Sequence, residues 1–88
     1  MPFDSAATPL SHAHKGDRGV VVRIDADQSR DGHDLERRLI EMGLVEGARI
    51  EVLHEGLIGG DPIALKVDDM RVALRRREAA RIAIERFD

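Results

Sequence analysis

One stretch of this chain has a clear helical period, and it lies between segments that alternate like strands. Within residues 35–47, Leu35, Leu39 and Met42 recur at i, i+4 and i+7, so they share one helix face, with Ile40 at its edge. No other segment has this period over a comparable length. The sequence therefore predicts a short amphipathic helix inserted into a mainly extended chain.

The residues around this helix predict its boundaries. Asp34 is expected to be the N-cap, because its carboxylate can accept a hydrogen bond from a free amide of the first turn. Gly43 is expected to end the helix, since glycine adopts a left-handed conformation without a Cβ clash, and Leu44 is expected to fold back onto the last turn. Glu46 and Gly47 then indicate a tight turn into a strand.

Alternating apolar residues predict five short strands. In the first of them Val20, Val22 and Ile24 are expected to face the core. The other alternating segments are residues 49–54, 63–67, 70–74 and 82–84, with a glycine-rich connection at 55–62, a turn at Asp68-Asp69 and one helical turn within 75–81. This pattern predicts a mainly β fold: a small closed antiparallel β-barrel, with the helix between the first and second strands and no exposed sheet edge.

Composition limits the classes of protein that this chain can represent. Its 88 residues, 42% of them hydrophobic, are enough for one small domain with a real core. Residues 1–9, with two prolines and no periodicity, are expected to be a flexible arm, and residues 10–88 the domain. The absence of cysteine excludes disulfides and thiolate-ligated metal sites. No apolar run is long enough to span a membrane, so we expect a cytoplasmic protein without direct membrane insertion.

Four histidines are weak candidates for a metal site. Imidazoles, together with aspartates of the polar segment 25–34, would suit zinc or ferrous iron. However, two of the histidines lie in or beside the arm, and no His-x-x-x-His pair lies on a predicted helix, so ordinary surface histidines are the better explanation. The four are His12, His14, His33 and His54. We therefore predict no metal site and no cofactor.

The sequence offers no catalytic residues. Adjacent aspartates, such as Asp68 and Asp69, lie in predicted turns, where local hydrogen bonding favours aspartate. General acid or base work would need a pocket that shifts a pKa. The glycines of residues 56–60 lack the Gly-Lys-Ser/Thr ending of a phosphate-binding loop and precede a proline. We therefore predict a protein that is not an enzyme.

One cluster of positive charge stands out in a chain whose formal net charge is -3. Arg75, Arg76, Arg77 and Arg81 surround a single acidic residue, Glu78. Such a patch could neutralise phosphates of a nucleic acid, but the predicted strands have no aromatic residues on which bases could stack. An acidic protein partner or a solvated face explains the cluster at least as well.

Two large apolar residues, Leu57 and Ile58, lie at the tip of the glycine-rich connection. Two interpretations are equally open. Either the loop folds over one end of the barrel and plugs it, or the two side chains form a contact patch for another protein, together with Leu44 and Val45 near the helix end.

Several spaced motifs together resemble the FeoA family, over about residues 10–85. The motifs, in the order usual for the family, are Leu10-Ser11, Gly16 with Gly19, Arg37-Arg38-Leu39, Glu41-Met42-Gly43-Leu44, Gly47 with Ile50 and Val52, Gly60-Asp61-Pro62-Ile63, Ala73-Leu74-Arg75, Glu78-Ala79, and Ile82-x-Ile84. The chain departs from the family pattern at Glu46, where proline is frequent, and at Asp69, where glycine is frequent in the hairpin turn.

The resemblance implies an SH3-like β-barrel and a small cytoplasmic accessory protein of ferrous iron transport. Its expected partner is a FeoB-type transporter, contacted at its cytosolic GTPase domain or its membrane portion through Leu44, Val45, Leu57, Ile58, Arg75, Arg76 and Arg77. A homo-oligomer is possible, and no nucleic-acid partner is expected. A nucleic-acid-binding or metal-responsive regulatory barrel is the alternative. A related barrel forms the C-terminal domain of the iron-dependent DtxR-type repressors. In this sequence only a short arm precedes the barrel, without the winged helix and dimerisation helices of those repressors, so a free-standing repressor is not expected.

Overall fold

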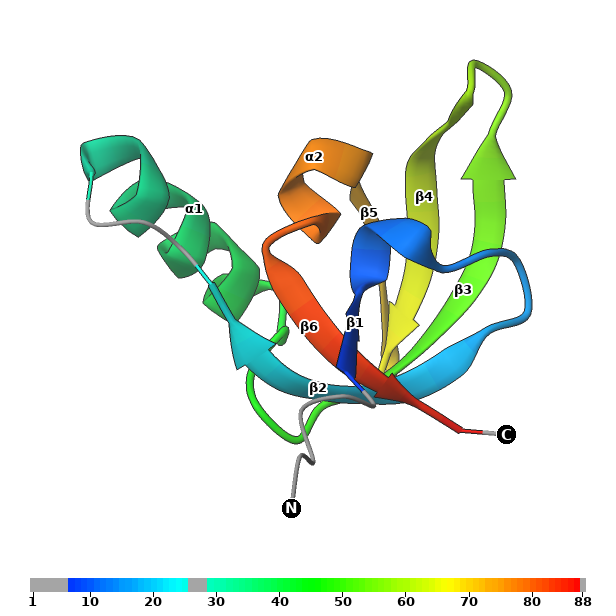
Figure 1. Ribbon diagram of the computed structural model, residues 1–88, viewed down its shortest axis with the longest axis horizontal. Coiled ribbons are helices and arrows are strands. Elements are labelled where there is room, and N and C mark those ends of the chain that lie inside the picture. The colour runs from blue at the N-terminus through cyan, green and yellow to red at the C-terminus, as the bar shows by residue number, and fades with distance from the viewer. Residues whose placement is uncertain (1–6, 26–28, 88) are drawn as a thin grey trace.

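The described residues fold into one six-stranded antiparallel sheet with two helices and a short 3-10 helix (Figure 1). The computed structural model describes residues 7–25 and 29–87. The elements in chain order are β1 (Ala7–Pro9), the 3-10 helix η2 (Leu10–His12), β2 (Arg18–Ile24), α1 (Arg30–Glu41), β3 (Arg49–Gly56), β4 (Gly60–Val67), β5 (Met70–Leu74), α2 (Arg76–Ala79) and β6 (Ile82–Arg86). The order of strands in the sheet is β1-β6-β2-β3-β4-β5.

The sheet is strongly curved but open, which differs from the closed five-stranded barrel that the sequence predicts. Within residues 7–25 and 29–87, no pairing joins β5 to β1, so both strands are edges. The additional strand is β1. Its three residues, predicted as the end of a flexible arm, pair with β6 from Ala7 opposite Glu85 to Pro9 opposite Ala83. Residues 7–9 therefore belong to the sheet, while residues 1–6 of the predicted arm lie outside the described residues.

The core is aliphatic and lies on the concave side of the sheet. The alternation predicted for β3 and β4 is confirmed, with Ile50, Val52, Ile63, Leu65 and Val67 each at most 3% exposed. Close packing on this side also determines where glycine is needed. A Cβ on Gly19 of β2 would lie 2.5 Å from the Glu85 carbonyl oxygen of β6.

The predicted inward face of β2 is wrong in part. Val21, not Val20 or Val22, is buried in the core, while Ile24 packs against the core from its edge. The reason is a β-bulge: the pairing with β6 shifts register between Val21 and Arg23, which moves the inward side of the strand by one residue. An uninterrupted apolar run does not reveal such a shift.

Helix α1 starts five residues earlier than predicted. Ser29 is the N-cap, and its Oγ accepts a hydrogen bond from the Gly32 backbone N–H at 3.1 Å. Asp34, the predicted N-cap, lies inside the helix. The end is as predicted. Gly43 has a left-handed φ of 87°, and the Leu44 N–H donates back to the Leu39 carbonyl at 2.9 Å.

The two hairpins differ in how well the sequence predicts them. The β4–β5 hairpin has the expected turn, with Val67 opposite Met70. The residue with positive φ in this turn is Asp68 (52°), not Asp69. The β3–β4 hairpin is longer than expected, because its strands extend to Gly56 and from Gly60. As a result, the predicted connection shrinks to three residues at the tip of a hairpin that projects from the rest of the sheet (Figure 1).

Candidate interaction surface

The tip of the β3–β4 hairpin exposes two large apolar side chains. Leu57 is fully exposed and Ile58 is 86% exposed, so the interpretation that this loop plugs one end of the barrel is wrong. The turn is tight: the Asp61 N–H donates to the Ile58 carbonyl at 3.2 Å, and Gly59 and Gly60 both have positive φ. Free apolar surface at a tightly turned, projecting tip is typical of a contact for another molecule.

An open groove of about 570 Å³ begins beside this tip. The residues that line it come from the hairpin tip, the start of β4, the end of β5, α2 with its N-cap, and one position of α1. The lining residues are Arg38, Ile58, Asp61, Pro62, Ala73, Leu74, Arg75, Arg77 and Glu78. It is below called the tip groove.

The acidic groups of the tip groove already have partners within the chain. Glu78 pairs with Arg38 at 2.9 Å and also accepts a hydrogen bond from the Arg75 backbone N–H at 3.0 Å. Asp61 accepts from the Arg76 backbone N–H at 2.8 Å. By contrast, the guanidinium groups of Arg75 and Arg77 have no ion pair with any described residue, and both residues are exposed. The unpaired charge of the groove is therefore positive.

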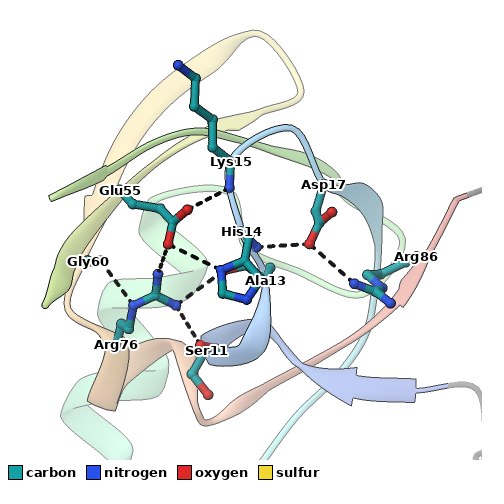
Figure 2. Close-up of polar contacts among 9 residues, drawn as sticks. All are labelled: Ser11, Ala13, His14, Lys15, Asp17, Glu55, Gly60, Arg76 and Arg86. Carbon is teal, nitrogen blue, oxygen red and sulfur yellow. Dashed lines mark hydrogen bonds and ion pairs between the residues drawn. The ribbon is translucent and has the colours of Figure 1, made fainter.

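Arg76, predicted as a partner contact, has a different role. Its guanidinium turns inward and donates to the carbonyl oxygens of Gly60 (3.0 Å), Ser11 (2.6 Å) and Ala13 (3.2 Å), and to Glu55 Oε1 at 2.7 Å (Figure 2). Only 21% of its side chain is exposed. Arg76 thus ties three segments together: α2, the segment around η2, and the base of the β3–β4 hairpin.

Glu55 extends this network to the N-terminal part of the chain. It accepts hydrogen bonds from the Lys15 backbone N–H at 3.1 Å and pairs with His14 Nδ1 at 3.3 Å (Figure 2). These contacts, the Lys15 N–H first and then the His14 ring, with a smaller effect of Arg76, hold the pKa of the Glu55 carboxyl below its ordinary value of 4.5. The charged form of Glu55 is therefore favoured by the folded state.

This pKa shift predicts a pH dependence of stability. Because the pKa of Glu55 is lower in the folded state, the unfolded state binds the proton first, and stability rises with pH between the two values. The contribution of Glu55 is fully present above about pH 4.5 and is lost as the pH falls through the lower folded pKa. We expect the difference in melting temperature between wild type and Glu55→Gln to shrink below that pH. Glu46→Gln, at an exposed position, is the control, and a difference that stays constant from pH 7 to pH 3 would contradict the prediction.

The predicted patch of Leu44, Val45, Leu57 and Ile58 does not form. Leu44 is completely buried in the core, where it closes the end of α1, and is not available to a partner. Val45 is 42% exposed, but it lines a different depression, together with Ile40. Sequence reasoning missed Arg38 and Pro62 as lining residues, because nothing in their spacing links α1 to β4.

The four candidate histidines do not come together around a metal. His14 contacts Glu55, whereas His12, His33 and His54 are exposed on three different elements. Among residues 7–25 and 29–87, no group of three or more His, Asp or Glu side chains has an arrangement that could hold a metal ion. Part of the aspartate-rich segment considered with them, residues 26–28, lies outside the described residues.

Neither α1 nor α2 has the length and apolar character needed to cross a membrane, and the described part of the chain contains no other helix that does.

The class of protein that this fold defines is a small, mainly β, SH3-like domain. A solved structure of similar fold is the zinc complex of FeoA from Stenotrophomonas maltophilia, described as a procaryotic SH3 domain protein. It has a TM-score of 0.77 and 29% identity, with coverage of 91% of this chain and 95% of that one. A model described as the FeoA domain matches residues 8–86. The chain belongs to the FeoA family, as the sequence motifs predict.

Two further relatives bear on function. The Fe(2+) transport protein A/Fe(2+) transporter FeoB fusion protein of Porphyromonas gingivalis is 36% identical over 76 residues. That match covers 86% of this chain but only 8% of the fusion protein. A manganese-dependent transcriptional repressor in complex with manganese has a TM-score of 0.78 and 26% identity, over 92% of this chain and 37% of the repressor. Segments similar to this chain therefore form part of a larger transport protein and of a larger transcriptional repressor.

Proposed function

We propose that this chain is a non-enzymatic, cytoplasmic accessory protein of ferrous iron uptake that docks on the cytosolic part of a FeoB-type transporter. The observation that carries the proposal is the fusion protein, in which a segment similar to almost the whole of this chain belongs to one polypeptide with the transporter. Fusion holds two modules at a high effective concentration, which is useful when they act on each other. A separate chain would need a docking surface to achieve the same proximity.

The experiment that tests this proposal is a calorimetric titration into the cytosolic GTPase domain of the transporter from the same source. It is carried out with GDP and with a non-hydrolysable GTP analogue. We expect saturable binding in at least one nucleotide state, and a difference between states would couple docking to the GTPase cycle. Absence of binding in both states, and to the full transporter in detergent, would refute the accessory role.

The apolar tip gives a first prediction about this docking. Leu57→Asp combined with Ile58→Asp is expected to weaken binding to the transporter while leaving the melting temperature nearly unchanged, because both side chains are exposed. Met70→Asp, at another exposed apolar position, is the matched control. Unchanged affinity of the folded double variant would remove the hairpin tip from the contact.

A second candidate function is a regulatory barrel that binds metal or nucleic acid. It is favoured by the similarity to the manganese-dependent repressor. Binding to nucleic acid would make retention on a polyanion column strongly dependent on salt and on Arg75 and Arg77, whereas metal sensing would raise the melting temperature with ferrous or manganous ions. Neither behaviour is expected of a transporter accessory protein.

A further inference from the structure

The tip groove combines two chemical features that do not neutralise each other. Its carboxylates, Asp61 and Glu78, are held by hydrogen bonds and an ion pair inside the chain, while Arg75 and Arg77 have no ionic partner among the described residues. Apolar surface adjoins these cations, because Ile58 and Pro62 line the same groove. A ligand that complements both features needs negative charge and a large apolar group.

The walls of the groove are held in place by the Arg76 network. Arg76 donates to the Gly60 carbonyl at the base of the tip and to Glu55 of β3 (Figure 2). The backbone N–H of Arg76 donates to Asp61 Oδ1. The Arg38–Glu78 pair fastens α1 to α2 on the opposite side. Since little ordering remains to be done on binding, a preformed groove of this kind favours recognition of a short segment.

From these observations we propose that the tip groove binds an acidic segment of a protein partner, with carboxylates on Arg75 and Arg77 and one large apolar side chain against Ile58 and Pro62. The proposal rests on the accessory function above in assigning this segment to the cytosolic part of the transporter. Planar guanidinium groups suit carboxylates because two parallel hydrogen bonds can form. Stacking of nucleic-acid bases would need aromatic side chains, and none lines this groove.

The test uses the full chain and two probes. The first is the transporter's cytosolic domain, and the second is a short fluorescent peptide of glutamate and serine with one leucine, compared with a glutamine version of the same peptide. The variant is Arg75→Glu with Arg77→Glu. Its control is Arg37→Glu with Arg71→Glu, which changes the net charge equally at exposed positions outside the groove. We expect the groove variant to weaken binding of both probes by about tenfold or more and the control to change it by less than about threefold.

The possible results separate this proposal from the accessory function. If the transporter domain binds equally to wild type and to the groove variant, the groove assignment is wrong and the accessory function stands. If wild type binds the acidic peptide in the expected way but not the transporter, the groove chemistry stands and the accessory function falls. Equal losses in both variants, or equal binding of a single-stranded DNA of the same charge, would reduce the groove to a general cationic surface. Self-association that only the groove variant abolishes would make a second copy the occupant and overturn the proposal.

Discussion

Leu39→Ala is expected to lower the free energy of unfolding by about 2–5 kcal/mol. Leu39 is completely buried and is the residue through which α1 reaches the core, with Leu35 and Met42 packed only partly against it. Removing its isobutyl group leaves a cavity that the surrounding aliphatic side chains fill only in part. Urea denaturation followed by circular dichroism measures the change.

The neighbouring residue provides the control for this prediction. Ile40 is 49% exposed, so Ile40→Ala is expected to cost less than about 1 kcal/mol. If the two substitutions cost the same, α1 would not be anchored to the core through Leu39. A more conservative change, Leu39→Met, conserves most of the volume and is expected to cost less than about 1.5 kcal/mol, which keeps the comparison measurable in a small domain.

Arg76→Ala is expected to lower the free energy of unfolding by about 2–4 kcal/mol, although Arg76 lies in a run of surface arginines. Its loss would remove a hydrogen-bond donor from the carbonyl oxygens of Gly60, Ser11 and Ala13, and would remove the ion pair with Glu55 at 2.7 Å. Arg76→Lys should restore little of this stability, because an ammonium group cannot reproduce the planar fork that reaches several acceptors.

Arg77→Ala is the matched control, at an exposed position of the same helix without an ion pair to the described residues. Its expected effect on stability is within about 0.5 kcal/mol. Its effect on partner binding should be the larger one. Thus neighbouring arginines are expected to separate folding from recognition, and equal destabilisation by the two alanine substitutions would contradict this division.

The sequence predicts those parts of the fold that depend on residues close together in the chain. The alternation of β3 to β5 and the end of α1 at Gly43 follow from side-chain period and glycine conformation, and the structure confirms them. The single helical turn before β6, predicted because the segment 75–81 is too short for an independent helix, is confirmed as well. The inward side of β2 depends on a bulge against β6, a strand far along the chain, so an apolar run could not reveal it. The start of α1 was missed because its first turns are polar and have no apolar period.

For the candidate surface too, the sequence does not predict contacts between residues that lie far apart in the chain. Sequence reasoning chose Leu57, Ile58, Arg75 and Arg77, which all remain exposed, but it also chose Leu44 and Arg76. Leu44 is buried because a left-handed Gly43 turns it back onto α1, and the same helix-end pattern predicts that contact with Leu39. For Arg76 no local signal exists. Which of three adjacent arginines turns inward depends in part on the carbonyl groups of Ser11 and Ala13, which lie 65 and 63 positions earlier in the chain.

The open sheet exposes this domain to a hazard that a closed barrel avoids. The outer backbone groups of β1 and β5 are templates on which a strand from another molecule could add, the first step of edge-to-edge aggregation. Both edges carry features that discourage it. Strand β1 has only three residues and ends in Pro9, which lacks an N–H, and β5 has only five and carries the exposed cation of Arg71. Short edge strands, one ending in proline and the other carrying a charge, therefore discourage polymerisation of this domain. In a closed barrel, the absence of edge strands would have the same effect.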